Sequence, residues 1–231
     1  MFLQKPFLTG WPARSLAALC LLAVSNLAAE TLTIGTTPIA VQTPEETCRI
    51  SDEDEVERGW LEVTSRGLNR DGFSLIAAYT DCDGLARWRV GEEDFLSHYT
   101  LIAVHHQFVW ERMQIPLPTV LDMLAHEYDE MVSVDVDEIV EETASGGEIR
   151  VGDVAYIGVL DRDELGIFPA FLATVVTEFG TTRRILIVNG VTVVNEKFLQ
   201  VQHLRDFEGE ASIEQALDIG KDWVGRLHRS N

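Results

Sequence analysis

Residues Arg183–Phe207 read RRILIVNGVTVVNEKFLQVQHLRDF, the longest apolar, β-branched stretch of this 231-residue chain. No charged residue lies between Arg184 and Glu196, and a second strand-like run, FLQVQHL, follows directly. Such a pattern is typical of two neighbouring antiparallel strands. The stretch therefore predicts a hairpin at the centre of a sheet, and it carries no information about chemistry.

Two positions could close this hairpin. Asn189-Gly190 is the usual two-residue turn, because both central residues must adopt positive φ. A turn there would leave the segment FLQVQHLRDF poorly paired, and unpaired buried backbone is costly. A turn near Asn195 instead gives two strands of similar length and leaves Gly190 as a β-bulge. We favour the turn near Asn195.

The first 29 residues have the layout of a secretory signal peptide. Lys5 and Arg14 form a basic flank, Ser15–Val24 is apolar, and small residues precede Glu30. The apolar part is shorter than the roughly 20 residues that a membrane span requires, although an uncleaved anchor is the alternative. We expect residues 1–29 to be a leader and the remaining protein to be periplasmic or secreted, without a membrane span.

The cysteines fit an exported protein. Loss of the leader would remove Cys20 and leave Cys48 and Cys82, which are 34 residues apart. An even pair in an oxidising compartment favours a disulfide over two free thiols. Closing a loop of this length would stabilise the fold by about 3–4 kcal/mol. Since the C-x-x-C spacing of redox and zinc sites is absent, we predict a structural disulfide.

The charge balance excludes some functions. The chain has 38 acidic and 18 basic residues, for a formal net charge of −20. Nucleic acids and anionic lipid surfaces both require a basic patch, so neither is expected to bind. A soluble protein, a basic partner or divalent cations remain compatible with this charge.

The rest of the chain alternates between strand-like and helical patterns. Predicted strands are 31–41, 73–80, 85–90, 101–110, 154–160 and 170–177, and predicted helices are 92–99, 116–131 and 212–227. Ser212 is a candidate N-cap for the last helix. We expect residues 30–231 to form one α+β domain, an antiparallel sheet with helices packed on it, including a long C-terminal helix.

An acidic helical segment spans residues 116–147 within this domain. Between Glu127 and Glu142 there are eight acidic residues and no lysine or arginine. The simple interpretation is the solvated outer face of an amphipathic helix pair. The functional interpretation is a docking face for a basic protein partner.

Two acidic segments could be metal sites, but the spacing of their acidic residues does not match that of a calcium-binding loop. Asp161, Asp163 and Gly166 fit three positions of a calcium loop, but Leu165 and Leu172 stand where oxygen ligands are required. The acidic run at residues 52–55 lacks the alternating ligand geometry of such a loop. We therefore assign no metal ligand.

The remaining motifs are no stronger. His105 and His106 are adjacent in a predicted strand and would face opposite sides, so they cannot chelate one metal. We expect one exposed and one core histidine, with His106 on the apolar side. No nucleophile elbow, phosphate loop or dinucleotide fingerprint is present. The sequence thus identifies no catalytic residue and no cofactor.

The last third, VVNEKFLQVQHLRDF followed by a helix ending in LHRSN, resembles exported PsbP-like domains. In those domains a final hairpin leads into a long helix packed on an antiparallel sheet. The resemblance implies a binding or accessory role by analogy. We expect a non-enzymatic binding or accessory domain of the cell envelope. A hydrolase-type enzyme and a divalent-cation-binding protein are the alternatives.

Overall fold

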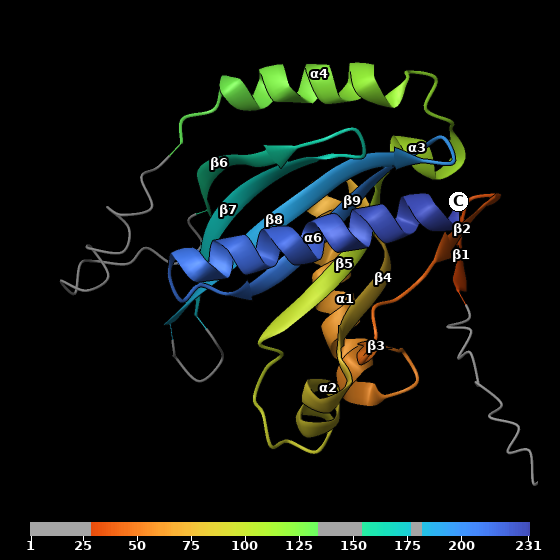
Figure 1. Cartoon of the computed structure of the whole chain (residues 1–231). Helices are drawn as coiled ribbons and strands as arrows, with labels where there is room; N and C mark the ends of the chain where they lie inside the picture. Colours follow the sequence, from red (N-terminus) through yellow and green to blue (C-terminus); the bar gives the residue numbers. More distant parts are fainter. Residues whose placement is uncertain (1–28, 134–153, 177–181) are drawn as a thin grey trace, which may run out of the picture.

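The computed structural model describes residues 29–133, 154–176 and 182–231 (Figure 1). Seven described strands form one antiparallel sheet in the order β3-β4-β5-β9-β8-β7-β6, and β1 and β2 form a separate hairpin. The elements are β1 Glu30–Ile34, β2 Thr37–Val41, β3 Thr47–Arg49, α1 Glu55–Arg70, β4 Phe73–Asp81, α2 Cys82–Arg89, β5 His98–His105, α3 Gln107–Trp110, α4 Leu117–Asp129, β6 Val154–Arg162, β7 Ile167–Val176, β8 Thr182–Val194, β9 Lys197–Asp206 and α6 Glu210–Ser230. The predicted α+β class with a long C-terminal helix is confirmed.

The central hairpin turns where the sequence predicts. Asn195 and Glu196, with φ of 48° and 63°, form the two-residue connection between β8 and β9. Gly190 is not a bulge, because it pairs with Val201 in an unbroken register. A Cβ at Gly190 would lie 2.7 Å from Cγ2 of Val224 on α6. Glycine is therefore needed there for the close approach of α6 to β8.

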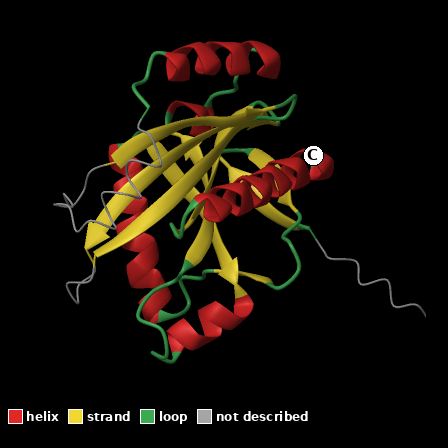
Figure 2. Cartoon of the chain, turned by 60° about the vertical axis from the view of Figure 1, so that its left-hand side comes forward, coloured by secondary structure: helices red, strands yellow, loops and turns green. Residues whose placement is uncertain are grey.

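Helices cover both faces of the sheet (Figure 2). On one face, α6 and the β1–β2 hairpin enclose the largest core, in which Trp223 and Val224 pack over Val188 and Val201. On the other face, α1 and α2 pack on the first strands, and α4 packs on the later ones through Leu121. Alternate residues of the central strands supply these two cores, as the period of a strand requires.

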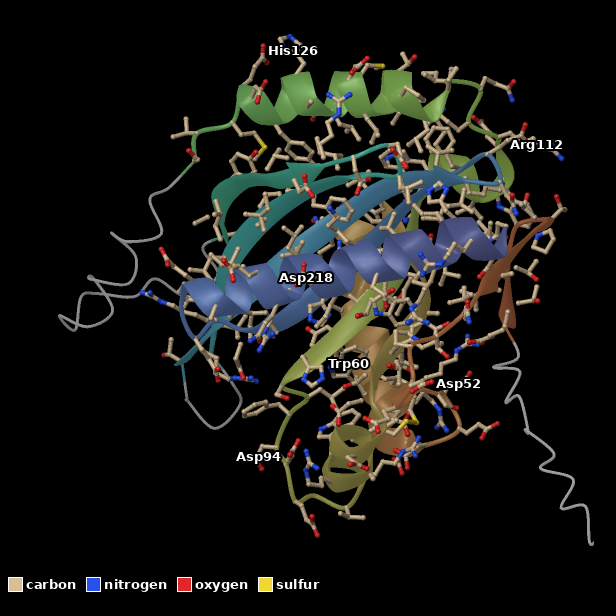
Figure 3. The ribbon with its side chains drawn as sticks, in the orientation of Figure 1. Asp52, Trp60, Asp94, Arg112, His126 and Asp218 are labelled. Atoms are coloured by element: carbon tan, nitrogen blue, oxygen red, sulfur yellow. A yellow bond between two sulfur atoms is a disulfide. The ribbon has the colours of Figure 1, made fainter. Side chains whose placement is uncertain are left out.

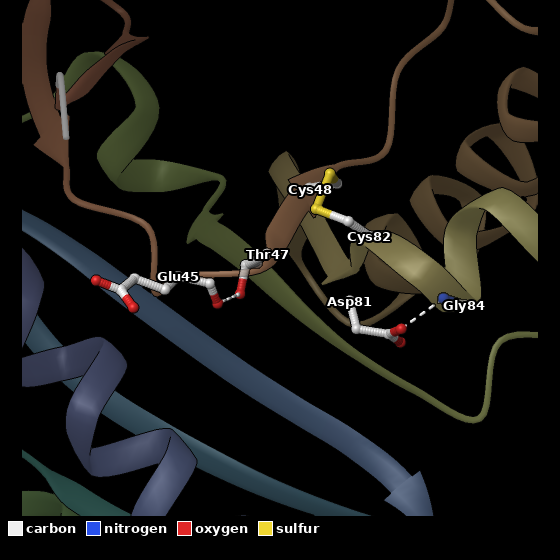
Figure 4. Close-up of a disulfide and its surroundings, with 6 residues drawn as sticks. All are labelled: Glu45, Thr47, Cys48, Asp81, Cys82 and Gly84. Atoms are coloured by element: carbon white, nitrogen blue, oxygen red, sulfur yellow. Dashed lines mark hydrogen bonds between the residues drawn. A yellow bond between two sulfur atoms is a disulfide. The ribbon is translucent and has the colours of Figure 1, made fainter. Parts of the chain in front are cut away.

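The disulfide between Cys48 and Cys82 is confirmed, with their Cα atoms 4.9 Å apart (Figure 4). It joins β3 to the first residue of α2. β3 is short and pairs only with the C-terminal end of β4, from Tyr79 to Asp81. The disulfide therefore fixes a three-residue edge strand that has few hydrogen bonds of its own.

Several local predictions are wrong, and caps explain two of them. The segment predicted as a strand at 85–90 lies in α2, because the Asp81 side chain caps the backbone N–H of Gly84 and starts a helix (Figure 4). At α6 the N-cap is Gly209, and the Ser212 hydroxyl instead donates to the Gly209 carbonyl.

The helix predicted at 92–99 is absent: residues 92–97 form a loop between α2 and β5, and residues 98–99 begin β5. The strand predicted at 101–110 ends at His105 and is followed by α3. The first predicted strand, at 31–41, is two strands that reverse at Gly35, where φ is 61°. In the last two cases an apolar run continues through a change of element, so its periodicity does not mark the boundary.

Lys197 is buried, although lysine side chains are normally exposed. Lys197, at 1% exposure, donates from Nζ to the carbonyls of Val109 and Glu111, at 3.0 and 2.9 Å. Burial lowers the pKa of its ammonium group. The two bonds attach the C-terminal end of α3 to the central hairpin, and they supply the partners that a buried cation requires.

The acidic helical segment is described only in part. α4 packs through Leu117, Val120 and Leu121, while His126 on its outer side is exposed. Residues 134–147, with most of the acidic block, lie outside the described residues, as does the predicted leader through residue 28. No helix in the described ranges is long and apolar enough to span a membrane.

Candidate functional site

Three of the acidic residues considered as metal ligands, Asp54, Asp161 and Asp163, have other partners. Asp54 is the N-cap of α1, where its carboxylate accepts from the N–H groups of Val56 and Glu57. Asp161 and Asp163 both form ion pairs with Lys221 of α6. Within the described ranges, no group of three or more His, Cys, Asp or Glu side chains is arranged to hold a metal ion.

His105 and His106 are also separated. His105 packs edge-on against Phe73, with ring centroids 5.4 Å apart, whereas exposed His106 contacts Asn69 through Nε2 at 3.1 Å. The prediction of one core and one exposed histidine is only partly right, because His105 is half-buried and His106, expected on the apolar side, is the exposed one. The reason is that β5 ends at His105, so strand alternation does not extend to His106.

A group of polar side chains lies in a pocket beside α6, which we call the acidic pocket. Its volume is about 400 Å³, within the usual range for a small-ligand site. β3, β4, β5 and β9 supply its floor and one wall, and α6 supplies the opposite wall. It is lined by Pro44, Glu45, Glu46, Thr47, Tyr79, Thr80, Asp81, His98, Tyr99, Thr100, His203, Asp218, Ile219, Asp222 and Trp223.

The charged residues of the acidic pocket have one sign. Five carboxylates line it, and none of its described lining residues is a lysine or arginine. Asp222 is held by Arg226 and Arg229, the next basic residues along α6. Asp218, one helical turn earlier on the same side of α6 (Figure 3), forms no ion pair with another described residue. The pocket therefore contains a carboxylate, that of Asp218, which no described basic residue pairs with.

A buried histidine lies at the floor of this pocket. His203 on β9 is 2% exposed, and its Nδ1 lies 3.0 Å from the Oγ1 of Thr100, its cross-strand partner on β5. Its Nε2 is buried and has no hydrogen-bond partner. Burial, assisted by nearby His98 and Arg205, lowers the pKa of His203 to about 3. The imidazole is therefore neutral at physiological pH, and its buried Nε2 makes no hydrogen bond within the protein.

Aromatic rings form the side of the acidic pocket next to the core. Tyr79 and Trp223 pack together with ring centroids 4.9 Å apart, and Tyr79 donates to Oε2 of Glu30 at 2.9 Å. Burial raises the pKa of Tyr79 and of Tyr99 to about 12. Both phenols therefore stay neutral, and the electron-rich faces of such rings favour cations.

At the rim, His98 connects two polar groups. Its Nε2 lies 3.3 Å from Oδ2 of Asp81, and its Nδ1 lies 3.2 Å from Oγ of Ser97. Serine, histidine and aspartate are thus linked in one chain of contacts. Ser97 is exposed and precedes His98 directly, so this contact is local.

Sequence reasoning missed this pocket because its residues come from five separate segments. One available signal was the polar alternation of His98 and Thr100 in a strand that is otherwise apolar. Another was His203 within the predicted central hairpin. No spacing rule connects these positions, since the pairing of β5 with β9 joins residues 103 apart in the chain.

No protein-family model, curated protein or solved structure matches this chain. The resemblance to PsbP-like domains therefore stays a prediction, and the functional argument depends on the site itself.

Proposed function

We propose that this chain is an exported, non-enzymatic binding domain that takes a cationic side chain with N–H donors into the acidic pocket. A lysine or arginine of a basic protein partner has this chemistry. The disulfide between Cys48 and Cys82 supports export, because such bonds persist in oxidising compartments. The proposal places the basic partner at α6, rather than at the acidic helical face expected from the sequence.

The observation that carries the proposal is the unpartnered Nε2 of His203 beneath a rim of carboxylates. A buried polar atom without a partner is costly, and a ligand that bonds to it removes the cost. When Nδ1–H donates to Thr100, Nε2 carries the lone pair that an ammonium or guanidinium N–H would use. Asp218 then supplies a charge-assisted bond, which is among the stronger kinds of hydrogen bond.

Calorimetric titration tests this proposal. The ligands are pentapeptides blocked at both ends, with lysine, arginine or uncharged norleucine at the centre of four glycines. We expect the lysine and arginine peptides to bind and the norleucine peptide not to bind. Asp218→Asn should weaken binding at least tenfold, while Asp94→Asn, at an exposed site outside the pocket (Figure 3), should leave it unchanged. Equal binding of the lysine and norleucine peptides would refute the proposal.

The contacts of His98 favour a second candidate, a hydrolase that uses Ser97. In that reaction Ser97 Oγ would attack an ester carbonyl, and His98 would take its proton and return it to the leaving alcohol. Water would then release the acyl group, with Asp81 orienting the imidazole. A fluorophosphonate probe that labels the wild type but not Ser97→Ala, together with p-nitrophenyl acetate hydrolysis lost in the same variant, would establish this activity. Absence of labelling would reject it.

A further inference from the structure

A second hollow lies on the other side of β4, between its outer edge and α1, and we call it the edge groove. Its volume is about 990 Å³. α1 contributes one side, β4 contributes Leu75–Ala78, and the loop after β3 closes one end. It is lined by Arg49, Ile50, Ser51, Asp52, Glu53, Arg58, Leu61, Glu62, Ser65, Arg66, Leu75, Ile76, Ala77 and Ala78.

The edge of β4 in this groove has no strand partner. β3 pairs with β4 only from Asp81 back to Tyr79, and the last bond is from Ile50 N–H to the Ala78 carbonyl. β4 continues for five residues to Phe73, and no strand of the described ranges pairs with that outer edge. An unpaired edge is a template for an added strand, because its peptide groups point outward in a regular row.

The direction of these peptide groups follows from their neighbours. Gly72 accepts from His106 N–H, so its carbonyl points toward the β5 side. Alternation along the strand then directs Phe73 and Leu75 to the outer edge, with Ile76 at the bulge between Leu75 and Ala77. Residues 73–77 read FSLIA and contain neither a charge nor a proline, two common devices that block strand addition.

Two arginines of α1 face the same groove without a carboxylate partner. Arg58 donates to the carbonyls of Asp52 and Glu53, at 2.9 and 3.4 Å, and Arg66 donates to that of Glu62, at 3.2 Å. Neither forms an ion pair with a described residue, although acidic residues outnumber basic ones two to one. Arg49, in contrast, is paired with Glu30. Arg58 and Arg66 are therefore the cations of the groove that have no carboxylate partner, although Asp52, Glu53 and Glu62 also line it.

We propose that the edge groove binds an extended acidic peptide segment, which adds to β4 as a strand and places two carboxylates on Arg58 and Arg66. The spacing is defined. Eight residues of helix separate the arginines by about 12 Å, which corresponds to roughly four residues of an extended strand. Residues four apart in a strand point to the same side, so the ligand carries its acids at positions i and i+4.

Fluorescence anisotropy with labelled nonapeptides tests this spacing. The probe alternates Thr and Val and carries Asp at positions three and seven; one control carries Asp at three and six, and another has Lys at three and seven. We expect the first peptide to bind at least tenfold more tightly than either control. Equal affinity of the three peptides, or no binding at millimolar concentration, would overturn the proposal.

Variants on α1 locate the contact. Arg58→Glu combined with Arg66→Glu should weaken binding at least tenfold, whereas Arg70→Glu, on the same helix but outside the groove, should not. Bound peptide should also protect the amides of Phe73 and Leu75 from hydrogen exchange. Unchanged exchange at Leu75, or an equal effect of Arg70→Glu, would contradict strand addition. Asp218→Asn should leave this binding intact, which separates the outcome from that of the acidic pocket.

Discussion

The acidic pocket and the edge groove lie on either side of one strand and differ in what they offer a ligand. The pocket, under α6, combines carboxylates with a buried imidazole nitrogen that has no partner. The groove, beside α1, combines two arginines without carboxylate partners with an unpaired strand edge. The pocket is suited to a single cationic side chain, whereas the groove is suited to the backbone of an extended chain. α6 beside the pocket and α1 beside the groove thus give the two hollows different chemistry.

Both hollows depend on β3, which contributes Thr47 to the pocket and Arg49 to the groove. β3 has only three residues and is held by the disulfide. A change in β3 therefore affects both sites, while changes in α6 or α1 affect one. The predictions that follow use this difference, from the largest expected effect to the smallest.

Removing the disulfide should have the largest effect. We expect Cys48→Ser combined with Cys82→Ser to lower the free energy of unfolding by about 3–4 kcal/mol, because the open chain gains conformational entropy in the unfolded state. Urea unfolding of the oxidised wild type, the reduced wild type and the variant measures the loss. Binding at both hollows should weaken together. Loss at only one hollow would show that β3 does not support both.

Acid should destabilise the fold through His203. Its pKa is about 3 in the folded protein and about 6.5 in the unfolded chain, so the unfolded state binds the proton first. Stability from the neutral imidazole is present above pH 6.5 and is lost as pH falls toward 3. Between pH 7 and 4.5 we expect a loss of about 2–3 kcal/mol from this residue.

The control is His203→Gln, which cannot titrate. Urea unfolding of both proteins at pH 7 and 4.5 gives the free energy of unfolding lost between the two pH values. We expect this loss to be smaller by about 2–3 kcal/mol in the variant than in the wild type, whatever the stability of the variant at pH 7. The groups near His203 are His98 on the neighbouring strand β5, Arg205 on β9 itself, and Asp218 and Asp222 on α6, and they are the same in both proteins. An identical pH dependence would show that His203 is not held neutral.

The close approach of α6 to the sheet depends on Gly190. Gly190→Ala should lower the free energy of unfolding by about 1–3 kcal/mol, because its Cβ would overlap Val224 and crowd Phe168. Gly59→Ala is the matched control, since nothing lies within 4 Å of a Cβ at that exposed helical position. There alanine should stabilise by up to about 1 kcal/mol. Thermal unfolding of the two variants should move in opposite directions.

The smallest effect is expected at Glu30, which contacts residues of both hollows. One of its oxygens pairs with Arg49 of the groove, and the other accepts from Tyr79 of the pocket. Because this ion pair is partly exposed, Glu30→Gln should cost less than about 1 kcal/mol in urea unfolding. It should also leave Arg49 free to bind an acidic peptide more tightly. A larger loss of stability would mean that β1 supports both sites.

The sequence predicts the parts of the fold that depend on local pattern. The central hairpin follows from β-branched residues, the position of its turn from strand length, and the disulfide from the two cysteines. α2 was missed because the cap at Asp81 overrides the apolar run that follows. Gly190 was misinterpreted because its reason, contact with Val224, is a tertiary one.

The two candidate sites were not predictable from the sequence. His203 is unusual only because its nitrogen has no partner once it is buried, and burial depends on the packing of α6. The groove depends on the length of β3, which sets where pairing with β4 stops. A strand boundary of this kind has no marker in the residues themselves.

Nuclear magnetic resonance tests the central claim most directly. The blocked lysine pentapeptide is titrated into isotopically labelled protein, and the signals of the two hollows are followed together. We predict that His203, Thr100 and Asp218 shift with one saturable affinity, while Leu75 and Arg58 remain unchanged. Shifts confined to the edge groove, or no shift at His203 at saturation, would contradict the account.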